Sequence, residues 1–160
     1  MSQGNQPEVC WPQFELCNPN SQVAFENMCR WLFNEFFFDG KAILHSDPNN
    51  PGIEVVPIYH PDSDKWISFQ AKYFSTIDYG QIKHSAETAV GHYAGQLDVI
   101  YLYCNKDVTT TSQSYITIEG ILSAAGIKII PITNQEVLTQ VLQRETIAWH
   151  FFDYFTLSQS

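Results

Sequence analysis

Two β-type runs joined by a short polar segment constrain the fold of this chain more than any other feature. The runs span residues 53–59 and 66–74 and are rich in β-branched and aromatic residues. The segment between them, His60-Pro61-Asp62-Ser63-Asp64, has a composition typical of a turn. This pattern predicts a β-hairpin. With a five-residue loop at 60–64, Tyr59 would face Lys65.

The hairpin is expected to bring three polar residues together. Residues two apart in a strand share a face, so Gln70 and Lys72 should project together, away from the apolar residues that alternate with them. The same register sets Glu54 directly opposite Gln70, on that face. Apolar residues flank all three, which is unusual for a solvated run of charges. A Glu opposite a Lys is also common as an ordinary cross-strand ion pair, and this alternative stays open.

Two short motifs carry a resemblance to a known family. Gly52-Ile53-Glu54, followed by Phe69-Gln70-Ala71-Lys72, resembles the signature of the PD-(D/E)xK nuclease superfamily. More narrowly, it resembles the Mrr-like restriction endonucleases, whose second motif reads Gln-x-Lys. It is also similar to the nuclease domains that open large bacterial antiviral STAND NTPases. The resemblance spans roughly residues 21–132.

The resemblance implies a role for each matching residue. Glu54 takes the place of the first metal-binding acid, Gln70 the second motif position, and Lys72 the catalytic lysine. Glu26 matches the acid on the first helix of the family. It also lies four residues before Arg30, so an ion pair along the helix explains it as easily.

The chemistry of phosphodiester hydrolysis calls for the same residue types. Mg²⁺ prefers oxygen ligands, which Glu54, Gln70 and the backbone carbonyl of Ala71 can supply. Lys72 would orient or deprotonate the attacking water. We therefore expect Mg²⁺ or Mn²⁺ as the cofactor. Glu54 stands where Asp is commoner in the superfamily, which shifts the carboxylate outward by one methylene group. Because Gln70 is neutral, metal binding should be weaker than with two carboxylates unless Glu26 contributes.

The order of the expected elements agrees with such a nuclease. The order α-β-β-β-α-β, followed by α-β-α, predicts an α/β protein with a restriction-endonuclease-like core (a mixed central sheet flanked by helices) and an α-β-α extension. The expected elements are a helix at 21–38, a strand at 41–45, the two hairpin strands, a helix after Asp78, a strand at 97–104, a helix at 114–125, a strand at 127–132 and a helix from 133 or 134 to about 144.

The chain is expected to form one domain. Its 160 residues are enough to bury a core of their own, with the nuclease-like core at about 21–132 and C-terminal helices in 133–160. Aromatic residues such as Trp149 and Phe152 crowd this last stretch, which suggests packing against something. They would either close the core of this domain or lead into a further module of a longer protein.

Charge is the main argument against nucleic-acid binding. The formal net charge is −9, which is unfavourable for binding the phosphates of DNA. The distribution softens this objection, since residues 1–64 carry nine acids and two bases whereas residues 65–106 carry three acids and four bases. Double-stranded DNA remains the expected partner. The isolated domain should bind it weakly, and the active form is expected to be a homo-oligomer assembled through the further module.

The sequence predicts a cytoplasmic protein without a membrane partner. No apolar run reaches the roughly 18 residues that a membrane span needs, and the N-terminus lacks the pattern of a secretory signal. The four cysteines show no CxxC spacing, so free thiols are expected.

The resemblance implies a metal-dependent DNA endonuclease that acts as an effector domain in bacterial antiviral defence, and two other functions remain open. One is a catalytically degenerate nuclease fold that serves as an oligomerisation or nucleic-acid-sensing module, with the neutral Gln70 as its sign. The other is a nucleotide-binding Rossmann-like half at residues 97–132, with its site at 105–112. The lack of a phosphate-cradling glycine loop counts against the second.

Overall fold

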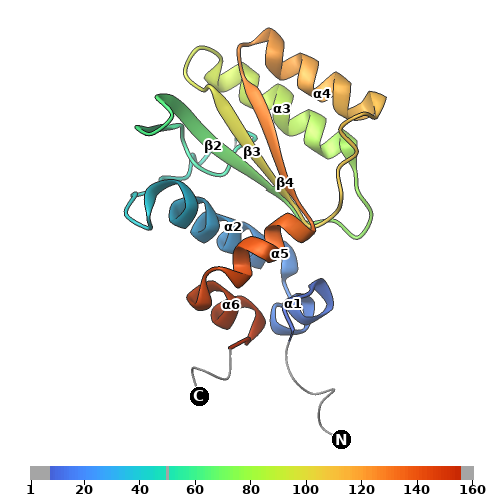
Figure 1. Cartoon of the computed structure of the whole chain (residues 1–160). Coiled ribbons are helices and arrows are strands. Elements are labelled where there is room, and N and C mark those ends of the chain that lie inside the picture. The colour runs from blue at the N-terminus through green and yellow to red at the C-terminus, as the bar shows by residue number, and fades with distance from the viewer. Residues whose placement is uncertain (1–7, 50, 156–160) are drawn as a thin grey trace, which may run out of the picture.

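The computed structural model describes residues 8–49 and 51–155, and this part of the chain has an α/β architecture (Figure 1). Its sheet is mixed, as the sequence predicts. The first two strands in the sheet order run antiparallel, and the remaining neighbours are parallel. In sheet order the strands are β1 (Ile58–His60), β2 (Lys65–Lys72), β3 (Val99–Cys104) and β4 (Lys128–Thr133).

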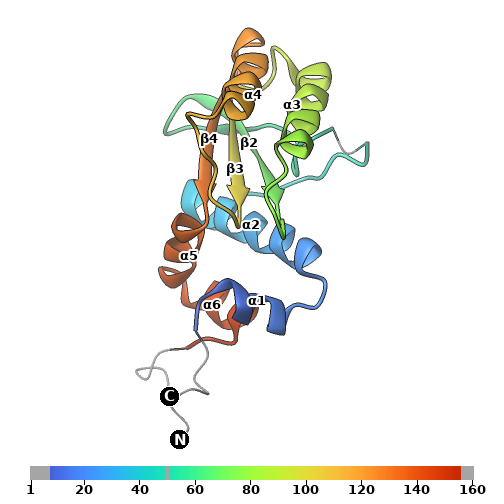
Figure 2. The same cartoon turned by 90° about the vertical axis from the view of Figure 1, so that its right-hand side faces the viewer.

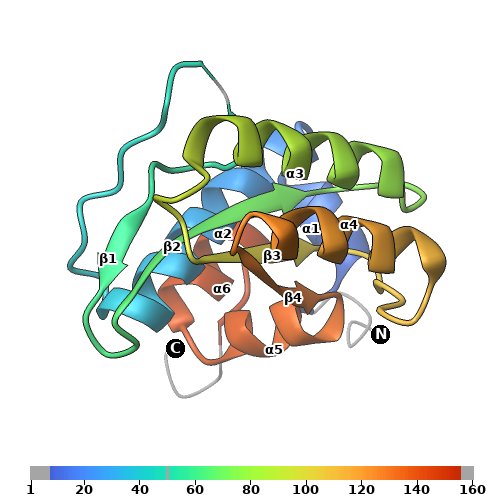
Figure 3. The same ribbon diagram turned by 90° about the horizontal axis from the view of Figure 1, so that it is seen from above.

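Helices cover both faces of this sheet (Figures 2 and 3). One face carries α3 (Tyr79–Tyr93) and α4 (Gln113–Ala124). The other carries α2 (Ser21–Phe38) and α5 (Gln135–Leu142). Beyond α2 lie α1 (Trp11–Cys17) and α6 (Glu145–Phe152), which contact each other.

Alternation along the strands produces two hydrophobic cores. Phe69 and Ala71 of β2 belong to the core on the α2 side, together with Phe33. Leu102 and Cys104 of β3 belong to the core on the side of α3 and α4. Because side chains alternate across a sheet, β3 and β4 contribute to both cores. The buried apolar residues of β2 all face the α2 side, and its polar residues Gln70 and Lys72 alternate with them.

The long helices follow their sequence signals closely. α2 has the expected bounds, and the Asn20 side chain accepts a hydrogen bond from the N–H of Val23 at 3.4 Å. It ends at Asp39, which adopts the left-handed conformation with φ 53°. Asp78 caps α3 by accepting from the N–H of Gln81 at 3.3 Å. These polar caps satisfy backbone groups that the helix ends leave unpaired.

The predicted strand at 41–45 is wrong. This segment has no regular structure, because a side chain takes the place of a neighbouring strand. The Asn34 amide accepts from the N–H of Ala42 and donates to its carbonyl oxygen, both at 3.0 Å. The core order α-β-β-β-α-β therefore has one strand fewer than expected.

The predicted hairpin register is wrong by one residue. The loop is Pro61–Asp64, so Tyr59 pairs with Trp66 rather than with Lys65. Asp64 adopts a left-handed φ of 55°, and its N–H donates to the Pro61 carbonyl at 3.2 Å. A tight four-residue turn of this kind brings His60 into the strand.

The first hairpin strand is also shorter than predicted, because residues 53–57 are irregular. The sequence does not predict α1. The helix expected from 133 or 134 to about 144 corresponds to α5, and α6 follows it within the stretch 133–160, where C-terminal helices are expected. Expected helical structure in 156–160 lies outside the described residues. All four cysteines are free, with Cys29 and Cys104 buried. None of the described helices is both long and apolar enough to cross a membrane.

Candidate active site

Gln70 and Lys72 project from β2 toward α3. Their neighbours Phe69 and Ala71 face α2, so alternation turns these two polar side chains to the other face, as the sequence predicts. Gln70 is buried, with 1% of its surface exposed, and Lys72 is half-buried. The Lys72 Nζ donates a hydrogen bond of 2.6 Å to the Oγ of Ser85 on α3.

Glu54 lies along the edge of β2 in the irregular segment before β1. Its N–H donates to the Phe69 carbonyl oxygen at 2.8 Å, and its Oε2 accepts from the N–H of Ala71 at 3.1 Å. The hydroxyl of Ser68 donates to the Val55 carbonyl at 2.6 Å. Hydrogen bonds made by the Glu54 and Ser68 side chains thus replace part of the backbone pairing between this segment and β2. Glu54 is not opposite Gln70 as predicted. Its carboxylate is nevertheless fixed at the edge of β2 by the N–H of Ala71, the residue that follows Gln70.

Gly52 explains how this segment approaches α3. Its φ of +87° lies in the left-handed region that favours glycine, and a Cβ at this position would overlap the carbonyl oxygen of Ser85. The start of the Glu54 segment therefore touches the backbone of the residue whose hydroxyl binds Lys72. This contact explains why the first residue of the Gly-Ile-Glu motif is a glycine.

Glu26 reaches the same edge from α2. It is half-buried and lines a pocket of about 320 Å³ together with Glu54. Arg30 lies one turn further along α2, and its guanidinium donates to the Ser46 hydroxyl and, at 3.4 Å, to the Glu54 carbonyl oxygen. Arg30 therefore holds the backbone of the Glu54 segment. The remaining pocket residues are Asn27, Asp47 and Ile53.

The charges of Glu26, Glu54 and Lys72 influence one another. Burial raises the pKa of Glu54 above its ordinary value; the Ala71 N–H opposes this rise, Glu26 adds to it, and Lys72 opposes it. Burial likewise raises the pKa of Glu26 against the attraction of Lys72. For Lys72, burial lowers the pKa, and the two carboxylates oppose the change. An amine and two acids with pKa values displaced toward neutrality suit proton transfer near pH 7.

Oxygen donors for a metal ion are present at this edge. The side-chain oxygen and nitrogen of Gln70 are buried without a hydrogen-bond partner among the described residues, which is costly for an amide. The N–H of Ala71 points to Glu54, and the two backbone polar groups of a strand residue point the same way, so its carbonyl faces that edge too. The residues present fit a hard divalent cation. Among residues 8–49 and 51–155, no cluster of three or more His, Cys, Asp or Glu side chains is arranged to hold a metal.

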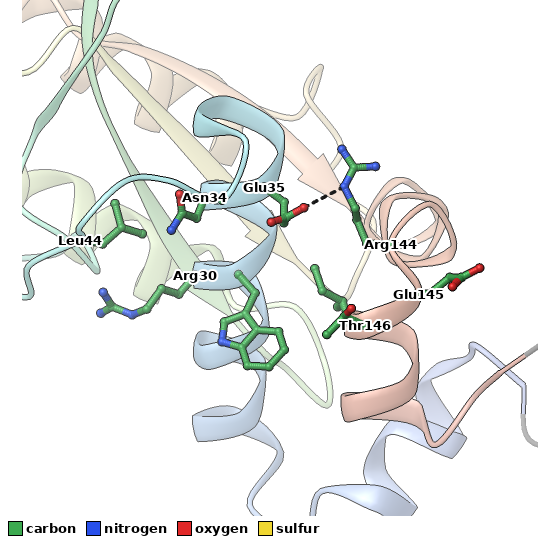
Figure 4. A pocket seen from close by; sticks show the side chains of 10 residues that line it. Arg30, Asn34, Glu35, Leu44, Arg144, Glu145 and Thr146 are labelled. Atoms are coloured by element: carbon green, nitrogen blue, oxygen red, sulfur yellow. Dashed lines mark hydrogen bonds and ion pairs between the residues drawn. The ribbon is translucent and has the colours of Figure 1, made fainter. Parts of the chain in front are cut away.

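A larger pocket of about 420 Å³ lies between α2 and the junction of α5 with α6 (Figure 4). Two of its charged residues pair with each other: Arg144 Nε contacts Glu35 at 3.1 Å, and the Arg144 guanidinium also stacks over Phe36 at 4.3 Å. Arg30 also lines this pocket, but its guanidinium points away from Arg144 (Figure 4). These contacts join the C-terminal helices to α2, and they offer no convergent set of catalytic groups.

Asn105, the first residue after β3, has a structural role. Asn105 is buried, and its amide accepts from the Phe74 N–H and donates to the Phe74 carbonyl, both at 2.8 Å. It thereby prolongs the pairing of β2 and β3 by a side chain. This clamp accounts for Asn105 without the nucleotide site considered at 105–112.

The sequence indicates no role in the site for Ser85 or Asp47, and it offers Arg30 only as an ion-pair partner of Glu26. In the structure the Arg30 guanidinium instead contacts Ser46 and the Glu54 carbonyl oxygen. Ser85 lies on the buried face of α3. Its position on the helix that follows the hairpin is the one indication in the sequence that it could belong to the site. Asp47 is a loop residue, as its sequence context indicates, and its carboxylate accepts a 2.6 Å hydrogen bond from the Tyr93 hydroxyl.

No protein-family model matches this chain, and a search of curated proteins found no match either.

Proposed function

We propose that this chain is a metal-dependent DNA endonuclease with a restriction-endonuclease-like core, similar to the Mrr-like members of the PD-(D/E)xK superfamily. The observation that carries the proposal is the convergence of Glu26, Glu54 and Lys72 from three separate elements on one edge of the sheet. The mixed sheet with helices on both faces is compatible with this core. The motif residues Gly52, Glu54, Gln70 and Lys72 all lie at or beside this edge.

The donor atoms support Mg²⁺ or Mn²⁺ as the cofactor. Glu54 and Gln70 would hold the ion with the Ala71 carbonyl, and Glu26 would contribute from α2 directly or through water. When bound, the ion would stabilise negative charge on the phosphate oxygens and acidify a bound water. One carboxylate and one neutral amide give a weak site, so millimolar metal is the appropriate range for assays.

The protein's own residues would manage the proton. Burial favours the neutral amine of Lys72, which can accept a proton from the attacking water at Nζ. The Ala71 N–H binds one carboxylate oxygen of Glu54, so the other oxygen is available to a ligand. Arg30 anchors the backbone of the Glu54 segment by donating a hydrogen bond to the Glu54 carbonyl oxygen. Each catalytic group is thus positioned by another element of the fold.

Duplex DNA as substrate and a role in bacterial antiviral defence follow from the resemblance. The net charge of −9 is consistent with a domain that needs assembly to act, because phosphate contacts dominate DNA affinity. We propose that the active form is a homo-oligomer in which several copies act on one duplex. A further module of a longer chain would hold the copies together.

Cleavage of supercoiled plasmid in Mn²⁺ tests the proposal. The wild-type chain should convert plasmid to nicked and linear forms, and EDTA should stop the reaction. Lys72→Ala and Glu54→Ala should each lower the rate at least 100-fold, whereas Lys128→Ala, an exposed lysine on the far strand β4, should not. Binding without cleavage by the wild-type chain would instead support a degenerate nuclease fold. Full cleavage by folded Lys72→Ala would remove the catalytic assignment.

A further inference from the structure

A slot of about 450 Å³ lies between the β-hairpin and the C-terminal end of α3. Trp66 of β2 lines it from the hairpin side, and Tyr93, the last residue of α3, lines it from the helix side. Its six described lining residues are all uncharged: Val56, Pro57, Trp66, Tyr93, Gly95 and Gln96. The slot therefore offers flat rings and one amide side chain, without a charged group on its described walls.

Trp66 presents its ring to solvent at the slot. It is 47% exposed, and Tyr59, its register partner in β1, is 40% exposed; the two ring centroids are 5.5 Å apart. The Trp66 N–H donates to the Oδ2 of Asp98 at 2.8 Å, which fixes the backbone beneath the ring. Two adjoining aromatic rings left in water indicate a binding surface more than a strand that only supports the fold.

The slot adjoins the candidate active site. Trp66 lies four residues before Gln70 in β2 and shares its face, so the two are about 13 Å apart along the strand. The Tyr93 hydroxyl donates a 2.6 Å hydrogen bond to Asp47, and Asp47 lines the pocket of about 320 Å³ with Glu54. One hydrogen bond therefore joins the walls of the two cavities, and an extended ligand can occupy both.

Charge decides which part of a nucleotide suits the slot. The aromatic residues around it donate hydrogen bonds to three carboxylates, those of Asp47, Asp64 and Asp98. Within the described part of the chain, none of these carboxylates has a cationic side chain within 4.0 Å. They would repel a phosphate group, as would the net charge of −9. A nucleobase is neutral and flat, and its stacking on an aromatic ring needs no opposite charge.

We propose that the slot binds one unpaired nucleobase of the DNA, stacked on Trp66 beside the metal edge. This inference rests on the proposed function and names its substrate more closely, as DNA with unpaired bases next to the scissile phosphate. A paired base is unavailable, because it must first leave the stack of the duplex. Gln96 supplies an amide that can donate to or accept from the edge of the base. Base stacking then provides affinity that this acidic chain cannot obtain from phosphates.

Fluorescence anisotropy of labelled oligonucleotides tests the slot without cleavage, because EDTA is present throughout. The probes are a single-stranded oligothymidylate and an oligomer of equal length in which abasic sites replace the bases. The wild-type chain should bind the first more tightly. Trp66→Thr removes the ring but keeps a residue suited to a strand. It should lose at least about fivefold in affinity for oligothymidylate and bind both probes equally.

Two further variants serve as controls. Trp66→Phe keeps a flat ring and should keep most of the affinity for oligothymidylate. Trp149→Ala removes another exposed indole, 59% exposed on α6 behind the opposite face of the sheet, and should bind as the wild type does. Equal binding of the two probes by the wild-type chain would overturn the inference, as would unchanged binding of oligothymidylate by folded Trp66→Thr.

An arginine-rich peptide is the third probe, because a guanidinium also stacks on an indole and is attracted by carboxylates. The wild-type chain and Trp66→Thr should bind this peptide equally. Binding of the peptide that depends on Trp66, without binding of oligothymidylate, would contradict the nucleobase and assign the slot to a protein partner.

Cleavage separates this inference from the proposed function. At low DNA concentration in Mn²⁺, the wild-type chain should cut a duplex with a short unpaired bubble at least about fivefold faster than the fully paired duplex. Trp66→Thr should cut both at the same rate. Equal rates for the two duplexes with the wild-type chain would refute the slot and leave the endonuclease intact. Trp66-dependent binding of oligothymidylate by a chain that cuts neither duplex would support the slot and contradict the proposed function.

Discussion

Gly52→Ala should destabilise the protein and displace the Glu54 segment. An added Cβ would overlap the Ser85 carbonyl oxygen and lie 2.9 Å from the carbonyl carbon, and both are backbone atoms that cannot rotate away. Left-handed backbone costs a non-glycine residue about 1–2 kcal/mol, and overpacking of a close contact adds about 1–3 kcal/mol. We expect a loss of about 3 kcal/mol in the free energy of unfolding.

Gly95→Ala separates the cost of the left-handed backbone from the cost of the close contact. Gly95 has almost the same backbone conformation, with φ +85°, but nothing lies within 4 Å of a Cβ built on it. This variant should lose only the conformational part, about 1 kcal/mol. Urea unfolding of both variants measures the difference, and the melting temperature of Gly52→Ala should fall by about 6–12 °C.

Cleavage should respond more strongly than stability. Glu54 lies two residues beyond Gly52, so a shift of the segment moves the carboxylate away from the Ala71 N–H. Gly52→Ala should therefore lose most of its metal-dependent activity under conditions in which it is still folded, and Gly95→Ala should keep it. Equal losses of stability in the two variants would refute the close contact between Gly52 and α3.

Three further predictions follow from the same contacts. Glu54→Gln should raise the free energy of unfolding at pH 8 in EDTA by about 1 kcal/mol. The pKa of Glu54 is raised in the folded state, so its ionisation disfavours folding as pH rises above the ordinary value of 4.5; the gain should vanish below that pH, and a gain that persists there would contradict the reasoning. Asn105→Ala should cost about 2–4 kcal/mol in urea unfolding, because it leaves two buried backbone groups of Phe74 unpaired, and a cost below 1 kcal/mol would show that water replaces the amide. Fusion to a tetramerising coiled coil should raise linear plasmid product steeply, since later contacts become intramolecular; equal activity per domain in monomer and tetramer would exclude a role for assembly.

The sequence predicts the parts of the fold that local signals determine. Asn20 and Asp78 are capping residues whose side chains bond their own helices, so the helix starts are readable from neighbouring residues. The alternation around Gln70 and Lys72 is equally local, and the orientation of both follows from it.

The errors lie where distant residues decide the structure. The 41–45 segment resembles a strand, but the Asn34 amide occupies the backbone N–H and carbonyl of Ala42. The register depends on a left-handed Asp64, which shortens the loop by one residue. Glu54 nevertheless lies beside the part of β2 that carries Gln70 and Lys72, because hydrogen bonds with Phe69 and Ala71 fix it there without strand pairing. A partner such as Ser85 depends on how α3 packs on the sheet, which no local pattern reveals.

Anomalous diffraction at the manganese edge from Mn²⁺-soaked crystals tests whether Glu54, Gln70 and Ala71 hold the metal ion. We expect a peak about 2.1 Å from a carboxylate oxygen of Glu54, the Oε1 of Gln70 and the Ala71 carbonyl oxygen. Glu26 should lie close enough to contact the ion or one of its waters. A Mn²⁺ ion bound elsewhere at high occupancy, with Gln70 still unpartnered at this edge, would contradict the assignment of the site.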